Sequence, residues 1–187
     1  MTYHATPESY RSDYLRVLHG LDLAQIDRFV GVLEGALEAG STVYIFGNGG
    51  SGATASHIAC DMNKGVSYGK ARRFKVVCLN DNVPTMMAYA NDVTYDDVFV
   101  EPLRNFLSSS DVVVGISGSG NSENVIRAID FANEVGAMTV GLSGYSGGRL
   151  KQKARLSVHV AADDMQMAED VHLMVGHMAM QALCTRG

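Results

Sequence analysis

Five short apolar runs alternate with amphipathic segments along most of the chain. The runs are continuous rather than alternating, which is typical of parallel strands that are covered on both faces. They span residues 42–46, 74–79, 111–116, 137–142 and 156–160. The segments expected to be helical span residues 51–64, 84–90, 96–108, 122–135, 147–154 and 164–184. This rhythm predicts an α/β protein, a three-layer α/β/α sandwich around a five-stranded parallel sheet.

Two further helices are expected before the first strand, over residues 8–19 and 22–39. In the second, Ile26, Phe29, Val30 and Leu33 recur at helical spacing, and Gly40 is a plausible stop. We therefore expect one domain over residues 1–187. Residues 1–40 would be N-terminal helices that pack against another subunit, and residues 41–187 would be the ligand-binding core.

Composition narrows the class of protein. The 187 residues are 47% hydrophobic and 19% charged, a globular balance, and the formal net charge is -5. An acidic chain argues against direct nucleic-acid binding. No apolar run approaches the roughly 20 residues that cross a bilayer, so we expect no membrane association. The first residues show no basic segment followed by an apolar one, so we expect a cytoplasmic protein.

A glycine-rich loop follows the first predicted strand and opens a helix. It reads GNGGSG from Gly47 to Gly52. Glycines let the backbone approach a ligand closely, and a helix N-terminus attracts an anion. The loop also matches GxGxxG, and Asp81 follows the second strand, where a ribose-binding acid could lie. A dinucleotide site and a plain tight turn are therefore alternatives to a phosphate site.

The loop after the third strand favours a phosphate monoester. It reads GISGSGNS, and a helix is predicted to begin at its end. The hydroxyls of Ser117, Ser119 and Ser122 converge there with backbone N–H groups, a set suited to phosphate oxygens. A dinucleotide fold does not require this second loop. The structural alternative is a turn with Ser122 as the helix N-cap.

The combination of GNGGS, GISGSGNSENVI and a late EDVHLMVGH resembles the phosphoheptose isomerase family of the SIS superfamily. That family converts sedoheptulose 7-phosphate to D-glycero-D-manno-heptose 7-phosphate in nucleotide-activated heptose biosynthesis. The resemblance implies a flavodoxin-like SIS core, a homotetramer with sites shared between subunits, and no organic cofactor. The superfamily also holds replication-initiator-associating proteins, so a non-catalytic sugar-phosphate binder remains an alternative. An oxidoreductase that binds a dinucleotide is a weaker one.

The resemblance also implies a metal site, most simply one zinc ion per chain, on His57, Asp61, Glu169 and His177. His57 and Asp61 are four residues apart and share a helix face. Asp61 stands where the family commonly has Glu, and Glu169 where it has Gln, so the set carries an extra negative charge. Glu169 and His177 are about 80° and 12 Å apart on an ideal helix. The two side chains can reach one metal ion only if both incline toward each other. His172 is the alternative ligand, which we interpret as a packing or interface residue.

By resemblance, either Asp61 or Glu169 removes the proton next to the carbonyl, and His177 moves a proton between oxygens through a cis-enediol. Gly118 stands where the family often has Thr. Asp92 is expected to bind substrate, and its alternative role is to cap the following helix. The residues expected to bind substrate are Asn48, Gly49, Gly50, Ser51, Asp61, Asn91, Asp92, Ser117, Gly118, Ser119, Ser122 and Glu169.

Overall fold

A single parallel sheet forms the centre of the chain in a computed structural model that describes residues 4–186. Its strands are β1 (Thr42–Gly47), β2 (Lys75–Cys78), β3 (Val112–Ser117), β4 (Met138–Ser143) and β5 (Leu156–His159). They lie in the order β2-β1-β3-β4-β5, and every neighbouring pair is parallel. The predicted five-stranded parallel sheet is confirmed, and the observed strands overlap all five apolar runs.

The helices are α1 (Pro7–His19), α2 (Leu23–Ala39), α3 (Gly50–Cys60), α4 (Val83–Asp92), α5 (Val100–Phe106), α6 (Glu123–Val135), α7 (Gly148–Lys153) and α8 (Met165–Arg186). A π-helical segment, Asp61–Val66, continues α3, and 3-10 turns cover Leu79–Asp81 and Tyr95–Asp97. The helix predicted over residues 96–108 is therefore shorter than expected, because the chain enters it through a 3-10 turn. None of the helices between residues 4 and 186 is both long and apolar enough to span a membrane.

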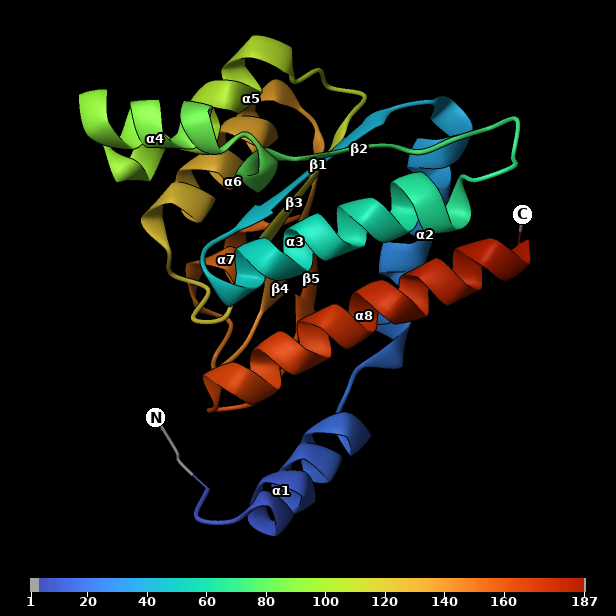
Figure 1. The fold of residues 1–187 in the computed structure, drawn as a ribbon, viewed down its shortest axis with the longest axis vertical. Coiled ribbons are helices and arrows are strands. Elements are labelled where there is room, and N and C mark those ends of the chain that lie inside the picture. The colour runs from blue at the N-terminus through green and yellow to red at the C-terminus, as the bar shows by residue number, and fades with distance from the viewer. Residues whose placement is uncertain (1–3, 187) are drawn as a thin grey trace.

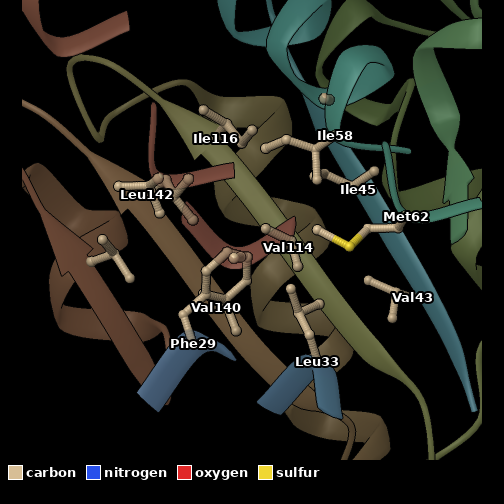
Figure 2. Packing of buried hydrophobic residues seen from close by; sticks show 14 of the residues in the cluster. Phe29, Leu33, Val43, Ile45, Ile58, Met62, Val114, Ile116, Val140 and Leu142 are labelled. Carbon is tan, nitrogen blue, oxygen red and sulfur yellow. The ribbon is translucent and has the colours of Figure 1, made fainter. Parts of the chain in front are cut away.

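Two apolar clusters hold the layers together. Helices α2, α3 and α8 cover one face of the sheet, where Phe29 and Leu33 pack toward Val114 and Val140 (Figures 1 and 2). Helices α5, α6 and α7 cover the other face, around Phe46. Because helices bury both faces of the sheet, the strand sequences are apolar at consecutive positions rather than at alternate ones.

The N-terminal helices differ in how they pack. Helix α2 is capped by Asp22, ends at Gly40 in the left-handed conformation, and buries one face in the chain's own core. Helix α1 buries no residue completely and projects from the body, alongside the start of α8 (Figure 1). The Tyr10 hydroxyl donates to Asp170 Oδ2 at 2.8 Å. Helix α4 likewise buries no residue. Both α1 and α4 therefore have most of their surface outside the core.

The strand order reverses between β1 and β3, which are neighbours in the sheet. In open parallel sheets, ligands bind beyond the carboxyl ends of the strands at such a switch point. The loops that follow β1 and β3 meet there, and these are the two loops rich in glycine and serine.

Candidate functional site

Two helices begin at the switch point with their N-termini side by side. Helix α3 starts at Gly50 after the N-cap Gly49, and α6 starts at Glu123 after the N-cap Ser122. Neither cap residue makes a side-chain hydrogen bond to its helix. First-turn N–H groups with no side-chain cap attract an anion, and the helix dipoles add to this attraction.

A pocket of about 240 Å³ lies between these helix starts. Ser51 and Ser117 are nearly buried beside it, and the hydroxyls of Ser117 and Ser122 are 3.0 Å apart. The pocket brings together nine of the twelve residues predicted to bind substrate. Its lining is Asn48, Gly49, Gly50, Ser51, Ile116, Ser117, Gly118, Ser119, Ser122, Met165 and Glu169.

Paired amides fix the position of the first loop. Asn48 donates from Nδ2 to Asn124 Oδ1 at 2.9 Å, and Asn124 donates back to Asn48 Oδ1 at 3.0 Å. The Tyr95 hydroxyl also donates to Asn48 Oδ1 at 2.7 Å. Asn124 is buried in the first turn of α6, so this exchange ties the β1 loop to the β3 loop. Sequence reasoning missed Asn124, although it lies within the motif GISGSGNSENVI.

Met165, the first residue of α8, also lines the pocket and was not among the residues predicted to do so. A Cβ on Gly118 would be 2.3 Å from Met165 Sδ. The thioether therefore fills the space that a larger residue at position 118 would need. The departure from Thr at this position was the available signal, but only the fold shows which side chain takes the space.

A second cluster lies where α3 runs into its π-helical segment. Nε2 of His57 and Nε2 of His177 are 3.0 Å apart, and they lie 3.5 and 3.8 Å from Asp61 Oδ2. One ligand atom from each residue lies within 4.8 Å of the others, a geometry that could hold a metal ion. Two imidazoles and a carboxylate are donors that zinc accepts. Asp61 begins the π-helical segment, and such bulges are frequent at functional sites.

Glu169 does not join this cluster. A Cβ on Gly50 would be 2.4 Å from Glu169 Oε2, so the carboxylate lies over the start of α3, in the pocket. Burial, and to a lesser extent the charge of Asp170, raises the pKa of Glu169. Glu169 was predicted to share a metal site with His177. Two helical turns separate them, and in this structure neither inclines far enough to remove that distance.

Helices α3 and α8 lie side by side and run in the same direction (Figure 1). A Cβ on Gly50 would clash with Glu169, and a Cβ on Gly176 would clash with Ile58. Further along, a Cβ on Gly65 in the π-helical segment would clash with Met180. Successive turns of the two helices are therefore in contact. The pocket and the histidine cluster therefore lie along one seam, separated by about the 12 Å that eight helical residues span.

Asn91 and Asp92 are placed elsewhere. Both are exposed at the end of α4, where Asn91 Nδ2 donates to Asp92 Oδ1 at 2.7 Å, and neither lines the pocket. The cap of the following 3-10 turn is Thr94, not Asp92. Asp81, the acid of the dinucleotide alternative, is exposed outside the pocket. His172 is completely buried, as the packing interpretation expects.

Comparison with known proteins decides the family. Residues 9–144 match the family model described as "SIS domain". The chain is 33% identical to a probable phosphoheptose isomerase of Thermoplasma acidophilum over 171 residues, which cover 91% of this chain and 93% of that protein. It is 37% identical to the phosphoheptose isomerase of Geobacter metallireducens over 153 residues, covering 82% and 80%. The chain belongs to the phosphoheptose isomerase family of SIS-domain proteins.

Solved structures of this family share the fold. The phosphoheptose isomerase of Francisella tularensis superposes with a TM-score of 0.88 over 95% of this chain and 96% of that one, at 22% identity. The phosphoheptose isomerase of Neisseria gonorrhoeae gives the same TM-score and coverage at 24% identity. The SIS fold that the resemblance implied is therefore confirmed.

Proposed function

We propose that the chain is an aldose–ketose isomerase that converts sedoheptulose 7-phosphate to D-glycero-D-manno-heptose 7-phosphate, in nucleotide-activated heptose biosynthesis. The observation that carries this proposal is the seam between α3 and α8, which has an anion pocket at one end and a histidine–carboxylate cluster at the other. A sugar with a phosphate group at one end and a carbonyl group at the other could occupy both ends of this seam. Membership of the phosphoheptose isomerase family supports the same substrate.

The pocket would hold the phosphate. Ser51, Ser117, Ser119 and Ser122 can donate hydroxyl hydrogen bonds to its oxygens, and the first turns of α3 and α6 add backbone N–H groups. Met165 closes one wall with an apolar surface. Asn91 and Asp92 lie outside this pocket, so a contact with the sugar would require another subunit or movement of α4.

The reaction moves two protons and no net electrons. A carboxylate removes the proton from the carbon next to the carbonyl, and the electron pair of that C–H bond forms the cis-enediol. The same carboxylic acid returns the proton to the neighbouring carbon, while His177 moves a proton between the two oxygens. Asp61 suits the base because it lies beside His177 at the carbonyl end of the seam. Glu169, whose pKa is raised by burial, is the alternative, but it lines the phosphate pocket and would have to turn toward His177.

His57, Asp61 and His177 fit a zinc ion, because two neutral imidazole nitrogens and a carboxylate oxygen make a common zinc set. When bound, zinc would take the Nε2 lone pair of His177, and the metal in place of that nitrogen would polarise or orient the sugar oxygens. We propose one zinc ion per chain on these three residues. Glu169 would complete the predicted set of four only if its side chain turned from Gly50 toward His177.

We propose a cytoplasmic homotetramer with residues 1–40 at a subunit interface and residues 41–187 as the sugar-phosphate-binding core. The support is that α1 and α4 bury no residue completely within one chain. Leu15 on α1 and Met87 on α4 are exposed apolar side chains of the kind that subunit contacts cover. Chemical cross-linking and light scattering would test the assembly.

A thermal-shift comparison would test the ligand class. We expect sedoheptulose 7-phosphate to raise the melting temperature, because a ligand that binds only the folded state stabilises it. NAD and NADP should not raise it. Stabilisation by a dinucleotide and not by the sugar phosphate would favour the oxidoreductase alternative. Stabilisation by the sugar phosphate without turnover would favour the non-catalytic binder.

A further inference from the structure

Tyr95 reaches the serine-lined pocket from outside it. The residue begins the 3-10 turn Tyr95–Asp97, and about half of its surface is exposed. Its hydroxyl lies 2.7 Å from Oδ1 of Asn48, which lines the pocket, whereas Tyr95 itself does not. Tyr95 can therefore act on a ligand in the pocket only by fixing Asn48.

A backbone donor sets the direction of every hydrogen bond around Asn48. The N–H of Val125 lies 2.9 Å from Asn124 Oδ1, and a backbone N–H can only donate. Because this contact fixes the oxygen of Asn124, its amide nitrogen must donate to Asn48 Oδ1, at 3.0 Å. Asn48 Nδ2 then donates back to Asn124 Oδ1, at 2.9 Å. The Tyr95 hydroxyl faces the oxygen of Asn48 and is therefore a donor.

These bonds leave the Asn48 amide with one free group. Its oxygen has two lone pairs, and the donors of Asn124 and Tyr95 use both. Its nitrogen has two hydrogens, of which one is given to Asn124 and the other has no partner among residues 4–186. A phosphate presents mainly acceptor oxygens, so a free N–H attracts it, whereas a free carbonyl lone pair would repel it.

The turn that carries Tyr95 is itself tied to α6. Arg127 donates from Nη1 to Asp97 Oδ1 at 2.8 Å, and from Nη2 to Asp96 Oδ2 at 3.3 Å. Arg127 is three residues beyond Asn124, so both lie on one side of α6. The same helix therefore holds Asn48 directly, through Asn124, and holds the turn whose hydroxyl completes the contacts of Asn48.

We infer that Tyr95 is a positioning residue for anion recognition. Its hydroxyl occupies the second lone pair of Asn48 Oδ1 and keeps the amide turned so that a donor is the group left for the ligand. The inference rests on the proposed function only in taking the pocket as the phosphate site. It gives the 3-10 turn after α4 a part in binding, although none of its residues lines the pocket.

The test is Tyr95→Phe, which removes the hydroxyl and keeps the ring. We expect inorganic phosphate to bind about fivefold more weakly by calorimetry, with little change in melting temperature. With sedoheptulose 7-phosphate, KM should rise by a similar factor while kcat changes little. The matched control is Tyr68→Phe, because Tyr68 is 80% exposed and lies outside the pocket. Unchanged phosphate affinity in Tyr95→Phe would overturn the inference.

A double-mutant cycle shows whether Tyr95 acts through Asn48. In the Asn48→Ala background, Tyr95→Phe should cause no further loss of phosphate affinity, because the group that it positions is gone. An equal loss in both backgrounds would mean that Tyr95 acts by another route, and would overturn the inference.

One measurement needs no variant. The side-chain ¹⁵N–¹H resonances of Asn48 should shift when phosphate saturates the unchanged protein, because the free N–H would donate to the ligand. Unshifted resonances would overturn the inference, as would an unchanged protein that does not bind phosphate. A protein that binds phosphate with the expected dependence on Tyr95 but does not isomerise the sugar would support the inference and contradict the proposed function alone.

Discussion

Nε2 of His57 and Nε2 of His177 lie 3.0 Å apart, although the residues are 120 positions apart in the chain. Two imidazole nitrogens at this distance can share one proton, with one ring donating and the other accepting. Asp61 Oδ2, at 3.5 and 3.8 Å, places a negative charge beside them. A cation that replaces the shared proton would bind all three atoms, which is the geometric basis for the proposed metal site.

Zinc content tests this site directly. Protein purified without chelator should contain about one zinc per chain if the site is fully occupied. His57→Ala should lose most of it, because His57 supplies one of the three ligand atoms. His19→Ala is the matched control, since His19 is an exposed histidine at the end of α1. Equal zinc in both variants, measured by mass spectrometry of the metal, would place the metal elsewhere.

Ser119 tests the phosphate pocket. Ser119→Ala should weaken binding of the sugar phosphate by roughly 1–3 kcal/mol, because a hydrogen bond to a charged group is lost. Ser122→Ala should act in the same direction. Ser110→Ala is the control, because Ser110 is an exposed serine that precedes β3, at the opposite end of the strand from the pocket. Calorimetric affinities that are unchanged in both pocket variants would remove the serines from the phosphate site.

The two carboxylates can be separated by their amide variants. Asp61→Asn and His177→Gln should fold and bind sugar phosphate while turnover falls on the order of 10²–10⁴-fold if both act in proton transfer. If Glu169 is the base, Glu169→Gln is inactive and Asp61→Asn is nearly as active as the unchanged protein.

The pH profile gives a second measurement of the base. A base must be ionised, and burial raises the pKa of Glu169. If Glu169 is the base, activity should therefore decrease as the pH falls. The midpoint of this decrease should lie above about pH 4.3, the ordinary pKa of a glutamate. An acidic limb at or below that value would exclude Glu169 as the base.

Gly118 and Met165 form a coupled pair in the pocket wall. Gly118→Thr should destabilise the fold by about 1–3 kcal/mol, because its side chain would overlap the Met165 thioether. Adding Met165→Ala to Gly118→Thr should recover much of that loss, and a denaturant double-mutant cycle measures the coupling. Independent, additive effects would mean that the two side chains do not compete for the same space.

The sheet was predictable because each strand is a continuous apolar run, and the serine loops follow directly from where those runs end. The pocket was predictable for the same reason, since parallel strands bring their carboxyl ends to one edge. The pairing of Asn48 with Asn124 depends on how two loops meet, which spacing does not specify. Neither the π-helical start at Asp61 nor the position of Glu169 over Gly50 can be read from helical periodicity, because both depend on the packing of α3 and α8.

The most direct test of the proposed function is a turnover assay with purified protein and sedoheptulose 7-phosphate. Anion-exchange chromatography with mass detection, or NMR, would resolve the two heptose 7-phosphates. We predict conversion to D-glycero-D-manno-heptose 7-phosphate, with incorporation of solvent deuterium at C2 of the product when the enediol exchanges its proton with D₂O. Conversion should be strongly reduced in His177→Gln. Binding of sedoheptulose 7-phosphate without any conversion, with the protein folded and zinc present, would contradict the proposal.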